Sequence, residues 1–210
     1  MVFFPVLSGM ALAATFELRS DVQLRWSGVC WTSRWFQVLY VVRMVMHCPI
    51  QWVTLKDNPR LRLQMTTHHI MSALCYLGSL GTGRMHFYAT LDGCCEVTTC
   101  LLNGVFAFKF FSPRDDSKHW CAKALLGTFL WLGFVVFRLL LFPAWLWSFY
   151  SDVTQHPSES WDRITVAERF GYPMVTIFLL CVSLAWMTPI TKGFFKVLGI
   201  QSKAKSRKVA

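Results

Sequence analysis

Two adjacent histidines, His68 and His69, lie in an apolar stretch with no charged residue from position 65 to position 83. A neutral imidazole can act as a general base, or as a nucleophile towards an acyl thioester. Successive residues of a helix point about 100° apart, so the two rings are not expected to serve the same reacting atom. The pair therefore indicates acyl-transfer chemistry by one histidine, and a purely structural role is the alternative.

Two acids lie further along the chain, at a spacing that favours one helix face. Asp92 and Glu96 are four residues apart, and Thr99 and Asn103 continue that face at the next turns. A carboxylate on this face can orient an imidazole and stabilise its cation, so both acids are candidate catalytic residues. Thr99 and Asn103 are candidate lipid-binding residues, and interhelical hydrogen bonding is their alternative role.

Three more polar side chains interrupt apolar stretches. Tyr76 continues the helical stripe that begins at the histidine pair, Arg43 lies within residues 35–55, and Arg138 lies midway along residues 124–151. Ionisable groups inside the hydrocarbon are costly, so each is a functional hypothesis. We expect Arg138 either to pair with Glu96 or Asp92, which would fix helix register, or to bind a lipid headgroup. Tyr76 is a further candidate for the lipid site.

The metal-binding motifs of membrane enzymes are missing. The sequence has six histidines but no HxxxH, HxxHH or HExxH arrangement. The eight cysteines show no CxxC pair and mostly fall in apolar segments, where a thiol behaves as a small hydrophobic group. We therefore expect no metal site and no bound cofactor, and acyl-CoA would be a co-substrate only if the chain is an enzyme.

The composition indicates the elements that must position these residues. The chain has 210 residues, of which 54% are hydrophobic and 15% charged, whereas soluble domains carry roughly a quarter charged residues. A spanning helix needs about 17–25 mostly apolar residues. The sequence therefore predicts an all-α, polytopic membrane bundle of about six transmembrane helices around a lipid-accessible cavity. The expected spans are residues 1–16, 35–55, 65–83, 84–108, 124–151 and 170–191.

The basic residues predict the topology. The net charge is +10, and the basic connections at residues 56–62 and 109–123 fall on the same side as the basic tail if there are six spans. Both termini would then be cytosolic. The first stretch is short, so a truncated helix, a signal segment and a five-span arrangement remain open. We expect one transmembrane domain at residues 1–200 with a basic cytosolic tail at 201–210, membrane lipids as partners and no nucleic-acid binding.

Three motifs, in order, resemble the TLC-domain family, which includes ceramide synthases and translocating-chain-associating membrane proteins. Residues 64–69 (QMTTHH) resemble its (E/Q)-M-x-x-H-H element. Residues 96–103 (EVTTCLLN) resemble the E-x-(S/T)-T-P-x-x-N element of the non-synthase branch, with Cys100 in place of proline. The segment FVVFRLLLFP, which contains Arg138 and Pro143, is similar to the family's penultimate helix.

The resemblance departs from the ceramide synthases at one element. If Asp92 and Glu96 match the end of their H-D-x-S-D-x-x-x-E pattern, Tyr88 and Ala89 replace its His-Asp pair. The resemblance therefore implies a six-helix bundle around an acyl-chain cavity in the endoplasmic reticulum or a related membrane, without implying ceramide synthesis. The end of the tail, Arg207-Lys208, also resembles a dibasic retrieval signal.

These observations favour a lipid-binding protein of membrane lipid homeostasis. One alternative is an acyl-CoA-dependent lipid acyltransferase that uses His68 or His69. Another is an endoplasmic-reticulum trafficking or translocon-associated factor in which the polar stripes are only structural. The oligomeric state is not indicated by the sequence.

Overall fold

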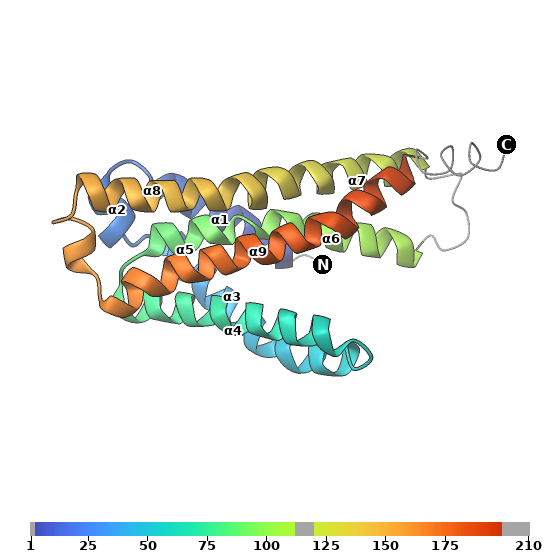
Figure 1. The fold of residues 1–210 in the computed structure, drawn as a ribbon, viewed down its shortest axis with the longest axis horizontal. Coiled ribbons are helices and arrows are strands. Elements are labelled where there is room, and N and C mark those ends of the chain that lie inside the picture. The colour runs from blue at the N-terminus through green and yellow to red at the C-terminus, as the bar shows by residue number, and fades with distance from the viewer. Residues whose placement is uncertain (1–2, 112–119, 199–210) are drawn as a thin grey trace.

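Every regular element of the computed structural model, which describes residues 3–111 and 120–198, is a helix. Long helical segments run side by side along one direction, and α3 and α4 form an antiparallel pair on one side of the bundle (Figure 1). The prediction of an all-α membrane bundle is confirmed. The elements in order are α1 (Phe3–Leu18), α2 (Val22–Ser27), α3 (Trp31–Thr54), α4 (Pro59–Thr82), α5 (His86–Gly93), α6 (Glu96–Phe111), α7 (Trp120–Phe134), a π-helix (Val135–Leu140), α8 (Leu141–Gln155), a 3-10 turn (Trp161–Arg163) and α9 (Val166–Val197).

Three segments are long and apolar enough to cross a membrane, judged by length and composition. They are His86–Phe108, Cys121–Gln155 and Val166–Lys196. The first helix is apolar but short, with 16 residues, while α3 and α4 have 24 residues each and a more polar composition. Within the described residues each predicted span is mostly helical, and the count of six crossings stays a prediction. The tail at 201–210 and part of the basic connection at 109–123 lie outside the described residues.

Local signals in the sequence set both ends of α4, the helix that carries the two histidines. Asn58 accepts a hydrogen bond from the backbone N–H of Leu61 at 3.1 Å, and Pro59 occupies the first turn of α4. The same helix ends at Gly83, whose φ of 65° is a conformation that glycine adopts without steric cost. The chain then turns directly into α5.

The sequence predicts one continuous helix over residues 84–108, but the structure shows two helices there, α5 and α6. A turn at Cys94 and Cys95 separates α5 from α6, and the backbone N–H groups of Cys95, Val97 and Thr98 donate to the carbonyl three residues back instead of four. This tighter winding rotates α6 relative to α5. Asp92 and Glu96 therefore do not share one helix face, and the prediction of a common face was wrong.

A π-helix interrupts the fifth segment at Val135–Leu140, around Arg138. Pro143 follows shortly after it; a proline lacks an N–H donor, and its ring crowds the carbonyl four residues earlier. The wider winding of the π-helix is a way to relieve that conflict. The sequence thus explains why the irregularity lies here.

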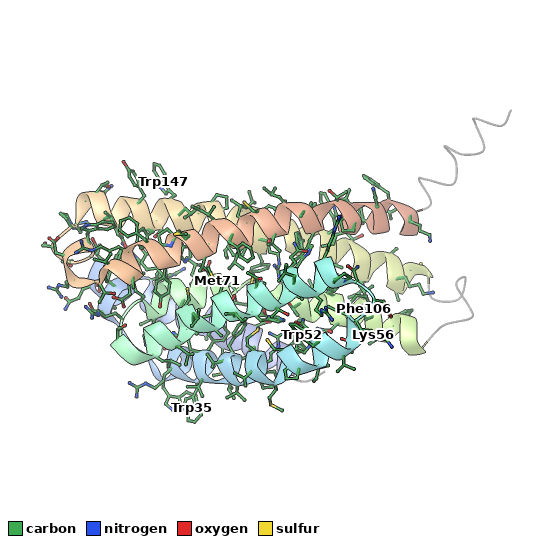
Figure 2. All side chains as sticks on the ribbon, turned by 60° about the horizontal axis from the view of Figure 1, so that its bottom comes forward. Trp35, Trp52, Lys56, Met71, Phe106 and Trp147 are labelled. Carbon is green, nitrogen blue, oxygen red and sulfur yellow. The ribbon has the colours of Figure 1, made fainter. Side chains whose placement is uncertain are left out.

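The buried core is strongly aromatic, and the outer surface is apolar as well. Trp26, Phe36, Tyr88 and Trp145 are fully buried. Trp147, with 72% of its surface exposed, projects away from the bundle, as does Trp35 (Figure 2). An apolar surface of this extent is the one that a bilayer covers.

Candidate functional site

A cavity of about 350 Å³ lies inside the bundle, bounded by side chains from α1, α3, α4, α6, α7 and α9 and from the π-helix. One part of its wall is polar and the rest is aliphatic or aromatic. Six of the predicted site residues line it. They are His68, His69, Glu96, Thr99, Asn103 and Arg138.

The two histidines have different surroundings. His69 is buried, and its Nε2 lies 2.9 Å from the amide nitrogen of Gln51 and 3.4 Å from Nδ1 of His47. Because an amide NH₂ donates, the lone pair of that ring nitrogen is already in use. His68, also buried, forms no hydrogen bond with any described residue, and its ring lies edge-on to Trp186 with centroids 6.0 Å apart. Nδ1 has no hydrogen-bond partner among the described residues in either ring, so the two histidines differ in that only His69 is held through Nε2.

Glu96 is held by α3. One of its carboxylate oxygens accepts from Nη1 of Arg43 at 3.1 Å, and the other accepts from the Tyr40 hydroxyl at 3.1 Å. The guanidinium of Arg43 also lies over the ring of Phe4, 4.4 Å from its centroid. The negative charge of Glu96 is therefore balanced by Arg43, and the predicted pairing of this acid with Arg138 is wrong.

Arg138 has no carboxylate partner within residues 3–111 and 120–198. Its Nε donates to the Thr98 hydroxyl at 2.8 Å, and that hydroxyl donates in turn to the Cys95 carbonyl at 2.7 Å. The guanidinium carbon lies 5.2 Å from the ring centroid of Phe134 and 5.5 Å from that of Trp186. Aromatic faces attract a cation, but they carry no net charge and do not neutralise it.

The structure places Asp92 and Tyr76 away from this cavity. Asp92 accepts from the Thr176 hydroxyl at 2.9 Å with one oxygen, and its other oxygen has no hydrogen-bond partner among the described residues. Both side chains instead border a separate void of about 10 Å³, about the space of one water molecule. Tyr76 packs against the ring of Tyr40, with centroids 4.6 Å apart. Neither residue contacts the histidine pair.

A second space of about 360 Å³ adjoins the cavity between α6, α7 and α9. Its lining is apolar except for Lys123, and we refer to it as the apolar extension. The two spaces share Leu102, Phe106, Leu130, Pro189 and Ile190. The extension lies towards the end of the bundle where α6 finishes and α7 begins (Figure 1). Sequence reasoning expected apolar side chains to line an acyl site but had no signal for which ones, because the lipid-facing surface has the same composition.

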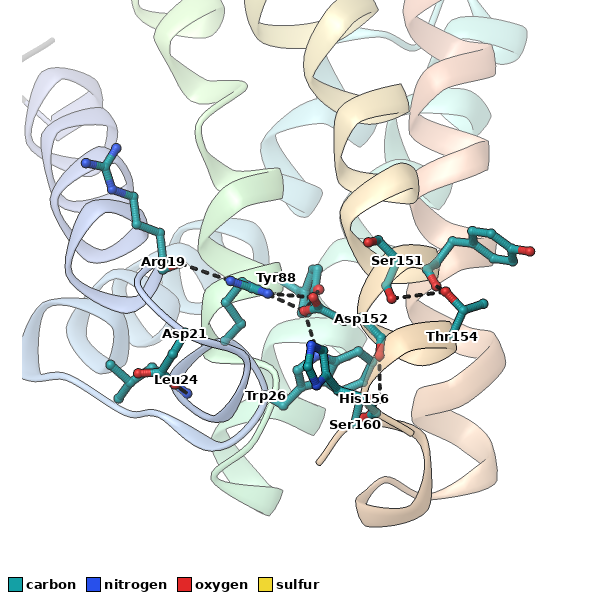
Figure 3. A network of polar contacts seen from close by, with 12 residues as sticks. Arg19, Asp21, Leu24, Trp26, Tyr88, Ser151, Asp152, Thr154, His156 and Ser160 are labelled. Carbon is teal, nitrogen blue, oxygen red and sulfur yellow. Dashed lines mark hydrogen bonds and ion pairs between the residues drawn. The ribbon is translucent and has the colours of Figure 1, made fainter. Parts of the chain in front are cut away.

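The sequence analysis missed a second polar cluster, whose contacts are drawn in Figure 3 and which lies by α2 and the end of α8, at one end of the bundle (Figure 1). Asp152 is buried and accepts from Nε and Nη2 of Arg25 at 2.8 and 2.5 Å, from Nε1 of Trp26 at 2.9 Å and from the Tyr88 hydroxyl at 2.7 Å. The hydrogen bond to Asp152 raises the pKa of Arg25 above its usual value. This cluster ties α2, α5 and α8 together. Its members had the appearance of ordinary connecting-loop charges, so only their proximity in space shows the role.

A metal centre has no obvious place in this arrangement. Within the described part of the chain, no three His, Cys, Asp or Glu side chains are grouped so that they could hold a metal ion. The polar wall of the cavity instead offers hydrogen-bond donors and the Arg138 guanidinium, which has no carboxylate partner in the part of the chain that the structure describes.

The sequence matches the family profile of the TLC domain across residues 3–192. The chain belongs to the TLC domain family. TLC domain-containing protein 4-A of Xenopus laevis is 22% identical over 170 residues, which are 80% of this chain and 61% of that protein. TLC domain-containing protein 4-B of Xenopus laevis is 22% identical over 132 residues, 63% of this chain and 48% of that protein. The chain thus covers between about half and three-fifths of these relatives' length, and no solved structure matches it.

The match to the TLC domain contains the whole cavity. The residues that line it run from Phe4 in α1 to Ile190 in α9, inside the matched range. The histidine pair and the 96–103 segment, which carried the resemblance, both border it. The relatives that match are TLC domain-containing proteins 4, in agreement with the expected non-synthase branch.

Proposed function

We propose that this TLC domain protein binds an acyl lipid in its cavity and takes part in membrane lipid homeostasis. The observation that carries the proposal is the cavity's division into a polar part, at His68 and Arg138, and an apolar extension between α6, α7 and α9. Its volume lies in the range of small-molecule sites, about 300–1,000 Å³. A lipid has the same division into a polar head and an apolar chain. The endoplasmic reticulum, or a related endomembrane, is part of this proposal through the family.

The test is to fill the apolar extension and measure the lipid that remains bound. Gly127 lines the extension, and a Cβ added there meets no atom within 4 Å, so Gly127→Leu places a side chain in the space without a clash at its base. Gly81, exposed on α4, has equally free surroundings and makes Gly81→Leu the matched control. Both substitutions raise helix propensity similarly, by up to about 1 kcal/mol.

Lipids that co-purify with the detergent-solubilised protein are quantified by mass spectrometry. We expect Gly127→Leu to retain at least threefold less acyl lipid per protein than the wild type, and Gly81→Leu to match the wild type. Equal retention by all three proteins, or no specific lipid on the wild type, would contradict the proposal.

An acyltransferase is the second candidate, and the free ring of His68 favours it. This histidine borders the cavity and has no hydrogen bond to a described residue, so a ring nitrogen is available to act as a base or nucleophile. The reaction would move an acyl group from acyl-CoA to a lipid amine or hydroxyl. An acyl adduct on the intact chain after incubation with acyl-CoA, present in His69→Ala but absent in His68→Ala, would support it. An adduct in neither the wild type nor the variants, with bound lipid unchanged, would leave lipid binding without turnover.

A further inference from the structure

We propose that the lipid's headgroup is an anion, a carboxylate or a phosphate, and that Arg138 binds it. This inference rests on the proposed function, because it names the class of lipid that the same cavity takes. It is carried by a buried guanidinium that faces the cavity without a counter-ion among the described residues.

The first step is the charge of the cavity wall. Three charged side chains line the cavity of about 350 Å³, and two of them, Arg43 and Glu96, neutralise each other. Lys123 lines only the adjoining extension. Arg138 remains, with 5% of its surface exposed. An unpaired buried charge costs several kcal/mol, and a protein retains such a group where something else supplies the opposite charge. An anionic headgroup would supply it.

The second step is the hydrogen-bonding capacity of the guanidinium. Arginine has five N–H donors in a planar fork, and in Arg138 only the Nε donor has a hydrogen bond to a described residue. The nearest groups on its faces are the rings of Phe134 and Trp186, which offer no lone pair. The two terminal nitrogens therefore keep the geometry that binds carboxylate or phosphate oxygens in pairs.

The third step is that the side chain is held in place. The Thr98 hydroxyl accepts from Nε while donating to the Cys95 carbonyl, so its single proton is committed and its lone pair points to the arginine. Arg138 also lies in the π-helix, a rare form of winding that occurs frequently at functional sites. A fixed, desolvated guanidinium loses little further entropy on binding an anion.

The fourth step concerns the membrane as the competing solvent. An acyl chain that leaves the bilayer for an apolar cavity exchanges one hydrocarbon environment for another, so the chain contributes little net selectivity. The headgroup must then decide which lipid is retained. The strongest headgroup contact that the cavity offers is a charge-assisted hydrogen bond from Arg138.

The experiment compares three lipids with matched chains on the whole 210-residue chain. Purified protein in detergent is titrated with oleate, dioleoyl phosphatidic acid or neutral dioleoylglycerol, and bound lipid is counted by native mass spectrometry. The variants are Arg138→Gln, Arg138→Lys and Thr98→Val, which keeps the arginine but removes its Nε acceptor. Arg169→Gln is the control, because Arg169 also stacks on a tryptophan, 4.9 Å from the ring of Trp161, but lies at the start of α9 away from the cavity.

We expect the wild type and Arg169→Gln to bind at least one anionic lipid at least tenfold more tightly than dioleoylglycerol. Arg138→Gln should lose that preference while its dioleoylglycerol binding stays within twofold. Arg138→Lys and Thr98→Val should retain part of the preference. A preference for oleate identifies a carboxylate ligand, and a preference for phosphatidic acid identifies a phosphate.

Two results would overturn the inference. If the wild type binds dioleoylglycerol as tightly as the anionic lipids, or if Arg138→Gln and Thr98→Val both keep the full preference, the headgroup assignment fails while lipid binding stands. If the wild type binds none of the three lipids, the assignment and the proposed function fail together. Size-exclusion profiles identify any variant that does not fold, and Thr98→Val then decides the outcome.

Discussion

The substitution Asp152→Asn is expected to destabilise the protein, because it replaces a buried, charged acceptor by a neutral amide. The Asp152 carboxylate accepts four hydrogen bonds from three side chains at the end of the bundle remote from the cavity (Figure 3). Oδ2 accepts three of them, from Nε of Arg25, Nε1 of Trp26 and the Tyr88 hydroxyl, and Oδ1 accepts one, from Nη2 of Arg25. Asparagine can place its oxygen at the position of Oδ2, but its NH₂ group then faces Nη2 of Arg25, and the remaining acceptor is neutral.

The size of the effect follows from the loss of the negative charge. Trp26 and Tyr88 are fully buried and then donate to a neutral oxygen, and a hydrogen bond to a charged group exceeds a neutral one by about 1 kcal/mol. The Arg25 side chain is 19% exposed, so water partly replaces its lost ion pair and its share is smaller. The sum is about 2–3 kcal/mol, which for a chain of this length is a fall of roughly 7 °C in the unfolding midpoint.

The assay is thermal unfolding of the detergent-solubilised protein, followed by tryptophan fluorescence at one heating rate, because multi-span proteins often unfold irreversibly. Asp162→Asn, an exposed acid in the following connection, is the matched control and should shift the midpoint by less than 2 °C, on the order expected for surface changes. Arg25→Gln should cost less than Asp152→Asn, and the double variant should cost less than the sum of the two. A shift below about 3 °C for Asp152→Asn, or strict additivity in the double variant, would refute the reasoning.

Two further stability predictions come from the contacts between α3 and the α5–α6 segment. Gly93→Ala should destabilise by about 2–3 kcal/mol, because its Cβ would lie 2.2 Å from Cζ of the buried Phe36; Gly81→Ala, which meets no atom within 4 Å, should be neutral or slightly stabilising in the same unfolding assay. Glu96→Gln should lower stability by about 2–4 kcal/mol, because Arg43 loses its counter-ion; the double variant Glu96→Gln/Arg43→Met should recover part of the loss, and no recovery would contradict the pairing.

Much of the architecture is readable from the sequence because hydropathy acts over single segments. A run of apolar residues long enough to cross a bilayer must satisfy its backbone hydrogen bonds internally, so it forms a helix whatever its neighbours are. Asn58 and Pro59 set the start of α4, and Gly83 sets its end, by local interactions that can be read from the sequence. The motifs at 64–69 and 96–103 likewise indicate the family from the sequence alone, because each is a short run of consecutive residues.

The pairing of the charged residues could not be predicted in this way. Arg43 and Glu96 are 53 positions apart, and Arg25 and Asp152 are 127 apart. Helical periodicity says which side chains share a face, but it does not say which helix that face meets. The expectation that Arg138 pairs with an acid failed on this point, since both acids in question have other partners.

The sequence by itself determined an apolar helical bundle and its family. It also identified a set of polar residues within apolar segments, where burial costs enough free energy to indicate a structural or functional role. The tertiary structure decided how that set divides: six residues border one cavity, whereas Asp92 and Tyr76 border another void. The physical reason is the turn at Cys94 and Cys95, which rotates α6 against α5 and sends the two acids to different neighbours. A change of winding over two residues cannot be read from a periodic pattern, and within the described part of the chain neither acid pairs with Arg138.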